Sequence, residues 1–185
     1  VRDYQGEGRL VYIHDLDLDR EGHPSILYTT SADHRPGPPG DPRWWTVAGW
    51  NGTAWRFEEL TAANHNYTTG CLQADDDGTS RVMGPTGKGP QPVGSGGEVA
   101  VWTRGNPDAP WRMEREMTRR SPRNHNYVRR VYRGHPDFYA FWADGDPETY
   151  SPSHLYFANR GGNAVWRLPY DMRKEEEEPE RIISG

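Results

Sequence analysis

The dipeptide Trp-Arg recurs in this chain at a nearly constant interval. Its three copies begin at Trp55, Trp111 and Trp166, so they are 56 and 55 residues apart. Another aromatic residue precedes each copy, namely Trp50, Trp102 and Phe157. Paired aromatic residues of this kind are typical of neighbouring antiparallel strands joined by a short turn. The regular interval therefore predicts three copies of one structural unit.

Each unit contains four segments in which apolar and polar residues alternate, bounded by Gly, Pro, Asp and Asn, as in β-strands. The predicted strands are 10–16, 25–30, 44–50 and 54–59; 69–74, 81–84, 98–102 and 111–116; and 127–132, 138–143, 154–157 and 164–168. Units of four short strands are typical of propeller blades. We therefore predict an all-β fold, a β-propeller of four-stranded antiparallel blades at about residues 8–60, 64–118 and 124–170.

Composition supports this fold and excludes several functions. The 185 residues have a mean hydropathy of −1.02, but eight Trp and ten Tyr supply packing bulk, and 21 Gly and 16 Pro favour many turns. A net charge of −5 gives no basic surface for nucleic acid, and no apolar stretch is long enough to span a membrane. The single cysteine, Cys71, excludes an internal disulfide.

Three blades are fewer than the four to eight that usually close a propeller. The chain also begins at Val1, without an initiator Met, inside an apparent β pattern. We therefore expect a part of a larger, seven-bladed propeller, with the remaining blades from a missing N-terminal part or from another chain. Residues 1–172 are predicted to form the blades, and 173–185, "RKEEEEPERIISG", a charged, solvated tail.

The stretch "DLDLD" carries Asp15, Asp17 and Asp19. We expect these to be polar alternates on a strand whose Leu16 and Leu18 face the core. A calcium loop would require Asp-x-Asp-x-Asp-Gly and a later Glu, which this stretch lacks. No cofactor is therefore expected, and a structural Ca²⁺ ion is the weaker alternative.

The tetrapeptide "NHNY" occurs at 64–67 and again at 124–127. In a blade whose strands run outward from the channel, both copies fall in outer-to-inner connections, and the long connections between second and third strands open at the same end. Loops of that length on a rigid scaffold often serve binding. The catalytic candidates at this predicted mouth are His65, Tyr67, His125, Tyr127 and Arg129. The substrate-binding candidates are His34, Arg35, Lys88, Glu98, Arg130 and Asp144.

This mixture of cations, imidazoles and phenols suits an acidic polar ligand. Arg129 and Arg130 are adjacent on a strand, so at most one should reach the cleft. The alternative is that "NHNY" is a corner motif whose side chains bond loop backbone, and that Glu98 pairs with a neighbouring Arg. No spacing typical of metal-binding histidines is present.

Two long stretches, "HNYTTGCLQADDDGTSRVMGPTGKGPQPVGSGGEVAVW" and "NHNYVRRVYRGHPDFYAFWADGDPETYSPSHLYF", resemble the BNR-repeat-containing propeller proteins. These neuraminidase-like folds occur among bacterial polysaccharide-degrading enzymes, including ulvan lyase-type polysaccharide lyases. The resemblance implies an extracellular or periplasmic protein that acts on an acidic polysaccharide. The chain departs from the family's Asp-box, because its best counterpart, "TRGNPDAPW", misplaces the Asp and the Gly. No sialidase arginine triad is therefore carried over.

The resemblance and the candidate residues together favour β-elimination beside a uronic acid. That reaction requires a base, a cation for the carboxylate and an acid for the leaving oxygen. We expect His65 or His125 as base, Tyr67 or Tyr127 as acid, and Arg129 as the cation, with Lys88 as its substitute. The alternatives are a glycoside hydrolase, for which Glu98 and Asp144 would be the carboxylates, and a saccharide-binding propeller without catalysis.

Overall fold

In the computed structural model, which describes residues 2–35, 37–92, 96–171 and 173–184, the chain forms three antiparallel sheets. The strands of each sheet follow one another in chain order. The first sheet contains β1 (Leu10–Leu18), β2 (Pro24–Ser31), β3 (Arg43–Trp50) and β4 (Trp55–Ala63). The second contains β5 (Cys71–Ala74), β6 (Ser80–Pro85), β7 (Val99–Arg104) and β8 (Arg112–Glu116). The third contains β9 (Asn124–Arg130), β10 (Ala140–Gly145), β11 (Leu155–Ala158), β12 (Ala164–Arg167) and β13 (Glu180–Ser184).

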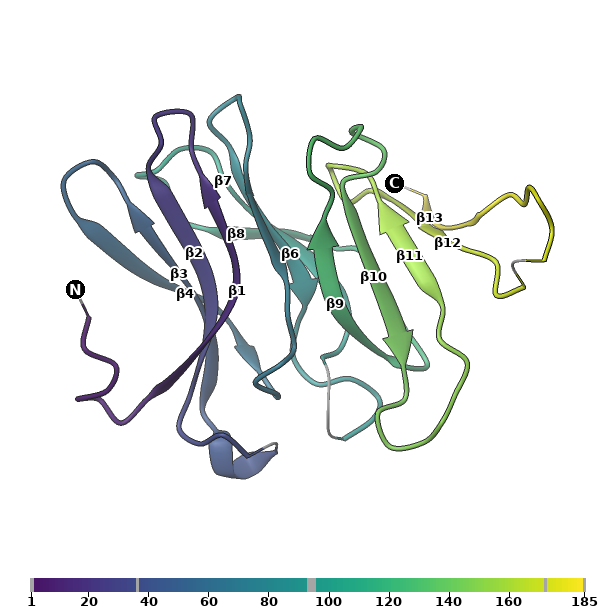
Figure 1. The fold of residues 1–185 in the computed structure, drawn as a ribbon, viewed down its shortest axis with the longest axis horizontal. Coiled ribbons are helices and arrows are strands. Elements are labelled where there is room, and N and C mark those ends of the chain that lie inside the picture. Colours follow the sequence, from purple (N-terminus) through teal and green to yellow (C-terminus); the bar gives the residue numbers. More distant parts are fainter. Residues whose placement is uncertain (1, 36, 93–95, 172, 185) are drawn as a thin grey trace.

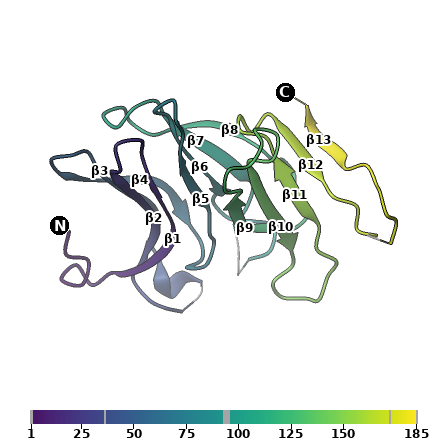
Figure 2. The ribbon, with the colours of Figure 1, turned by 45° about the horizontal axis from the view of Figure 1, so that its top comes forward.

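The sheets lie side by side in chain order, with the two termini at opposite ends of the row (Figures 1 and 2). The short β1–β2, β5–β6 and β9–β10 turns lie at one end of the strands, at the top of Figure 1. The long β2–β3, β6–β7 and β10–β11 connections lie at the other end, and η1 (Pro38–Gly40) belongs to the first of them. This separation of short turns from long connections agrees with the predicted order of strands within each unit.

The second sheet is covered on both faces. Leu72, Val82 and Trp102 pack on one side against Leu27, Trp45 and Val47 of the first sheet. Met83 and Val101 pack on the other side against the third sheet, where Val128, Trp142 and Val165 are buried. Alternate residues of one strand thus serve two different cores, as the period of two requires.

Polar contacts join the first strands of adjacent sheets. Asp15 and Asp17 on β1 accept hydrogen bonds from the backbone N–H groups of Leu72 and Ala74 on β5, each over 2.9 Å. Arg130 on β9 reaches the same carboxylates, with its Nη1 2.6 Å from Oδ2 of Asp17. The carboxylates therefore bind N–H groups at the outer edge of β5, where no other described strand pairs with its backbone.

These contacts overturn the expected orientation of "DLDLD". Asp15 and Asp17 lie toward the second sheet, whereas Leu16 and Leu18 are 47% and 53% exposed. A β-bulge between Ile13 and Asp15 inserts His14 as an extra residue, so the side-chain alternation shifts by one position. The N–H groups on the outer edge of β5 need hydrogen-bond acceptors. Asp side chains can accept these bonds and Leu side chains cannot, so the aspartates occupy the side of β1 that lies toward the second sheet.

Three further expectations need correction. Residues 180–184 of the predicted tail form β13, which pairs with β12. The second "NHNY" copy lies inside β9 rather than in a connection. The three predicted units are not exact copies of one another, because Trp111 packs between the first two sheets, whereas Trp55 and Trp166 lie on outward faces. The expected all-β, four-stranded pattern is otherwise present, and the described strands close into neither a barrel nor a ring.

Candidate functional site

The two "NHNY" copies each anchor a long connection, but through different residues. Asn66 is buried and donates from Nδ2 to the carbonyl oxygens of Asp33 and His34, each over 3.1 Å, which fixes the β2–β3 loop. Asn124 is also buried and fixes the β6–β7 loop through Gln91, whose backbone N–H lies 3.0 Å from Asn124 Oδ1. Asn66 and Asn124 thus bond loop backbone, which is the role that the corner-motif alternative describes.

His125 is only 1% exposed and both of its ring nitrogens are bonded. Its Nδ1 accepts the indole N–H of Trp142 over 3.2 Å, and its Nε2 lies 2.8 Å from the hydroxyl oxygen of Ser121. Because an indole can only donate, the proton of the neutral imidazole belongs on Nε2. Burial lowers the pKa of His125, although the charges of Glu98 and Asp144 oppose this shift. His125 is thus a neutral interior side chain and is not placed to contact a polysaccharide.

Glu98 belongs to the same network. Its carboxylate accepts hydrogen bonds from the hydroxyl groups of Thr118 and Ser121, over 2.6 and 2.7 Å, and from the backbone N–H of Ser121. Burial acts to raise the pKa of Glu98, but these hydrogen bonds together outweigh it and leave the pKa below its ordinary value. Glu98 is an ionised acceptor that ties the start of β7 to the β8–β9 connection.

Asp144 is likewise occupied, with a side chain only 2% exposed. It accepts the hydroxyl of Tyr156 over 2.7 Å and the backbone N–H of His154 over 2.8 Å, and the Nη1 of Arg123 lies 3.6 Å away. A cavity of about 280 Å³ lies beside this cluster and is lined by His154, Arg167 and Tyr170. Neither Glu98 nor Asp144 presents a free carboxylate to solvent.

Four of the predicted residues lie in or beside exposed surface where the first strands of the sheets meet. Tyr67 and Tyr127 are each 54% exposed, Arg129 is exposed, and His65 is partly buried. The segments that carry them touch, because the N–H of Val128, between Tyr127 and Arg129, donates to the carbonyl of Thr69 over 3.1 Å. We call His65, Tyr67, Tyr127 and Arg129 the inner-strand cluster.

Ring contacts connect the members of this cluster to their surroundings. The His65 and Tyr67 rings are 5.6 Å apart, Tyr67 meets Tyr12 edge to face at 5.6 Å, and the guanidinium of Arg129 lies 5.8 Å from the Tyr127 ring centre. Nδ1 of His65 accepts the backbone N–H of Tyr67 over 3.1 Å, so its neutral ring carries the proton on Nε2. Burial, and secondly the charge of Arg43, lower the pKa of His65, which favours this neutral form.

Tyr127 has an unusual backbone. Its φ is +56°, in the left-handed region, at a bulge in the pairing of β9 with β10. A bulky residue in this region is a true outlier, and such strain concentrates at functional sites. At this bulge the ring of Tyr127 is exposed to solvent, whereas the next residue, Val128, is fully buried.

The remaining predicted residues are His34, Arg35, Lys88 and Arg130. They lie in loops near the inner-strand cluster or form ion pairs with aspartates. His34 and Arg35 lie in the β2–β3 loop, exposed, and Arg35 binds Asp33 through two nitrogens. Lys88 pairs through its backbone with Gly96, which in turn pairs with His125, so the β6–β7 loop also borders this end. Arg130 is held by Asp15 and Asp17, whereas Arg129, the neighbouring arginine, is exposed.

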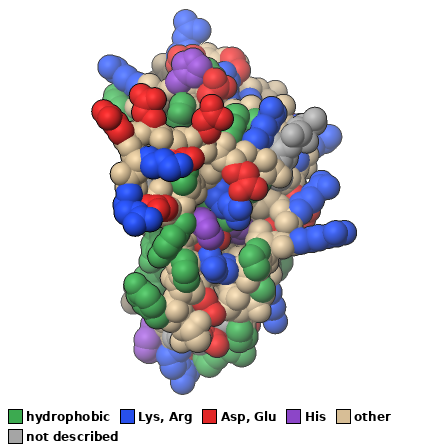
Figure 3. Space-filling model, turned by 90° about the vertical axis from the view of Figure 1, so that its right-hand side faces the viewer, with side chains coloured by type: hydrophobic (Ala, Val, Ile, Leu, Met, Phe, Trp, Pro, Cys, Tyr) green, Lys and Arg blue, Asp and Glu red, His purple; other side chains and the backbone are tan. Residues whose placement is uncertain are grey.

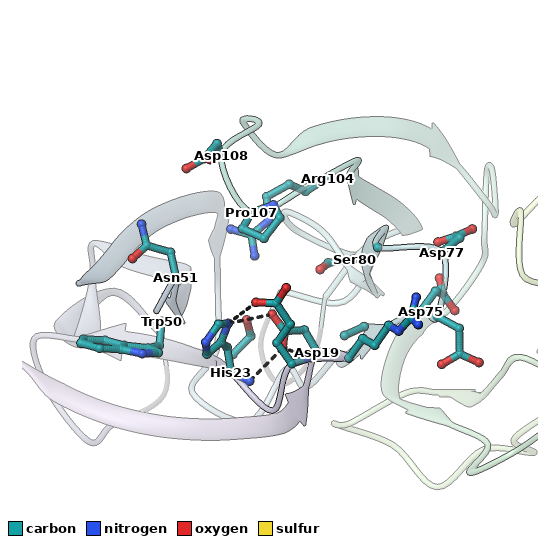
Figure 4. Close-up of a pocket in the computed structure, with 16 residues that line it drawn as sticks. Asp19, His23, Trp50, Asn51, Asp75, Asp77, Ser80, Arg104, Pro107 and Asp108 are labelled. Atoms are coloured by element: carbon teal, nitrogen blue, oxygen red, sulfur yellow. Dashed lines mark hydrogen bonds and ion pairs between the residues drawn. The ribbon is translucent and has the colours of Figure 1, made fainter. Parts of the chain in front are cut away.

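A cavity that the sequence did not indicate lies at the opposite end of the strands, between the turns of the first two sheets (Figure 4). It measures about 390 Å³ and is lined by Asp19, His23, Asn51, Asp75 and Arg104 among others. Three of its acidic side chains are engaged, since Asp19 accepts the backbone N–H of His23 over 2.8 Å, and Asp77 and Asp108 pair with Arg160 and Arg56. Within the described ranges, no three His, Cys, Asp or Glu side chains are grouped to hold a metal ion.

Comparisons of the chain with family models, curated proteins and solved structures found no significant match. The likeness to BNR-repeat proteins therefore stays a prediction. No helix in the described part of the chain is long and apolar enough to cross a membrane.

Proposed function

We propose that the chain is part of a β-propeller that binds an acidic polysaccharide and cleaves it by β-elimination beside a uronic acid. The observation that carries the proposal is the inner-strand cluster, in which two exposed phenols, an imidazole and a guanidinium lie on two segments that are joined by the backbone hydrogen bond from Val128 to Thr69. The strained backbone of Tyr127 supports a functional role for that residue.

The proposed chemistry divides among these groups. The guanidinium of Arg129 offsets the carboxylate charge as the proton leaves C5 of the uronate, while the C4–O bond breaks and a C4–C5 double bond forms. His65 is suited to donate rather than to accept, because its Nε2 carries the proton in the observed hydrogen-bonding pattern. We therefore assign proton removal to the phenolate form of Tyr127 or Tyr67, which becomes the neutral phenol. Proton delivery to the leaving oxygen falls to the Nε2–H of His65, which then regains a proton from water.

Hydrolysis is the less favoured reaction. It would usually require two carboxylates across the bond, and the two expected ones, Glu98 and Asp144, are held in hydrogen-bond networks. A saccharide-binding role without catalysis would use the same exposed residues. It differs from elimination in that no cleavage product forms.

The test uses uronate-containing polysaccharides and follows the ultraviolet absorbance of the new double bond alongside the release of reducing ends. Elimination predicts that both signals rise together. Each of the variants Tyr127→Phe, Tyr67→Phe and Arg129→Ala should lower the absorbance rate at least ~100-fold if the residue takes part in proton transfer or charge stabilisation. Tyr132→Phe, at a residue 79% exposed in the β9–β10 turn, is the matched control and should retain the rate.

Reducing ends without absorbance would overturn elimination in favour of hydrolysis. Saccharide binding without any product would leave only the binding role, and no binding to any acidic polysaccharide would overturn the proposal as a whole.

A further inference from the structure

The first and third sheets each leave one face uncovered by another sheet. On the first sheet, Val11, Ile13, Leu16 and Leu18 share the outward face of β1 and are 42%, 69%, 47% and 53% exposed. Trp50 and Trp55 extend that face, with ring centres 5.8 Å apart. We call these six residues the first open face. Tyr4 covers another part of the same side, where it contacts Tyr28 and Phe57.

The first open face resembles a face that is covered elsewhere in the molecule. Trp55 begins β4, and 56 residues later Trp111 directly precedes β8 in the second sheet. Trp111 packs into the core between the first two sheets, under the guanidinium of Arg104 at 4.9 Å. Arg104 also pairs with Glu58 of the first sheet over 3.1 Å. The repeated position of tryptophan indicates that the first open face is built to receive a sheet.

The third sheet carries an aromatic stack on its outward side. Phe138 and Phe157 stack at 4.6 Å and 13°, and Phe157 and Trp166 stack at 5.0 Å and 11°. Phe141 lies 5.7 Å from Phe157, and Leu155 beside them is 52% exposed. These five residues form the second open face. Figure 3 views the molecule from the side of the third sheet, where hydrophobic side chains gather in the lower part and charged ones above.

The geometry of the stack favours a protein partner over a sugar. A saccharide binds aromatic residues through an exposed ring face, whereas these rings use their faces on one another. Phe138, which is 45% exposed, and Leu155 present apolar surface of the kind that the sheets bury against each other in the two internal cores. Apolar surfaces of this kind mark interaction sites in proteins.

We propose that two copies of this chain associate head to tail, with the second open face of each copy packed on the first open face of the other. The junction is heterologous, because its two surfaces differ and lie at opposite ends of the row of sheets, so it must close into a ring or extend as a fibre. Two copies give six sheets, within the usual range of four to eight, whereas three would give nine. The inference rests on the propeller arrangement proposed above and not on its chemistry.

The test is the mass of the purified chain by size-exclusion chromatography with light scattering, over a series of concentrations. We expect a particle of twice the 21.1 kDa of one chain that does not grow further. Ile13→Asp and Phe138→Asp each place a charge on one open face and should give monomers. Met113→Asp is the matched control, because Met113 is a 55% exposed apolar residue of the second sheet, outside both faces, and it should stay dimeric.

Mixing the two monomeric variants distinguishes this junction from other dimers. Each mixed pair retains one intact junction, so equal amounts of Ile13→Asp and Phe138→Asp should again form dimers. A folded wild-type monomer, as expected if another protein segment supplies the missing sheets, would overturn the proposal, and so would open-ended polymers. Polysaccharide binding measured on the same samples separates the two proposals. A monomer that binds polysaccharide overturns only the proposed dimer. A dimer that binds no polysaccharide overturns only the proposed function.

Discussion

The guanidinium of Arg43 is fully buried and donates from Nε to Oδ1 of Asn66 across 2.6 Å. Its other nitrogens bind the carboxylate of Asp41 and the carbonyl oxygens of Gly37 and Arg35, at 2.7 to 2.8 Å. One side chain at the start of β3 thus fixes both the β2–β3 loop and the first "NHNY" copy. The orientation of His65 and Tyr67 depends on this buried arginine.

Replacing Arg43 should therefore destabilise the fold strongly. Arg43→Ala leaves Asn66 and two loop carbonyls without their donor, and the expected loss of unfolding free energy is ~3–5 kcal/mol. Urea denaturation measures it. Arg35→Ala removes an exposed arginine from the same loop, and because solvent screens its ion pair with Asp33, the unfolding free energy should change far less than in Arg43→Ala. Equal losses in the two variants would contradict a structural role specific to Arg43.

Two glycines make room for Trp45 between the first two sheets. A Cβ atom on Gly84 would lie 2.1 Å from Cη2 of Trp45, and one on Gly70 would lie 2.6 Å from it. Trp45 is completely buried and has no room to move. Gly84→Ala should therefore cost at least ~1–3 kcal/mol, because overpacking displaces a rigid core. Gly145→Ala is the strand control, since its Cβ meets nothing within 4 Å, and thermal unfolding should separate the two variants.

Stability should fall as the solution becomes acidic, because His14 is held neutral. Burial, and secondly the charge of Arg129, lower the pKa of His14 from 6.5 to about 3. Above pH 6.5 neither the folded nor the unfolded chain binds a proton at this site, so its full stabilising contribution is present. Between pH 6.5 and about 3 the unfolded chain binds the extra proton, and stability is lost by up to ~1.4 kcal/mol per pH unit.

The variant His14→Asn tests this assignment, since asparagine does not titrate. Urea unfolding at several pH values should show a shallower acid dependence for the variant than for the wild type. An unchanged slope would assign the acid sensitivity to other groups, such as His65 and His125, whose pKa values are also lowered.

The sequence predicted the strands well where apolar and polar residues alternate regularly. It did not predict the orientation of side chains whose position depends on a residue far away in the sequence. The alternation of apolar and polar residues predicted twelve of the strands to within a few residues. The orientation of Leu16 and Leu18 was wrong, because a bulge at His14 and the free N–H groups of β5 are not visible in a local pattern. His125 and Tyr127 are two residues apart, yet one is buried and the other exposed, and the tryptophan that bonds His125 lies 17 residues away.

The sequence analysis did not predict β13, because the apolar pair Ile182 and Ile183 follows a run of mostly charged residues at 173–181 and is too short to give an alternating pattern. β13 pairs with β12, and Ile182 packs against the core of the third sheet. Ile182→Asp should lower the unfolding free energy by ~1–3 kcal/mol, because it buries an unpaired charge against that core. Glu176→Ala, at an exposed position of the same segment, should change it by no more than ~0.5 kcal/mol. Equal, small effects would show that β13 contributes little to stability.

Tyr127 should be a residue whose removal costs function but not stability. A non-glycine residue in the left-handed region carries a strain of order ~1–2 kcal/mol, and glycine adopts φ of +56° without that cost. The more than half exposed ring contributes little packing, so Tyr127→Gly should fold with stability within ~1 kcal/mol of the wild type. Polysaccharide cleavage, in contrast, should fall at least as far as in Tyr127→Phe, because the phenol is lost. A stable variant with full activity would remove Tyr127 from the proposed site, and a strongly destabilised one would assign its unusual backbone to the fold instead.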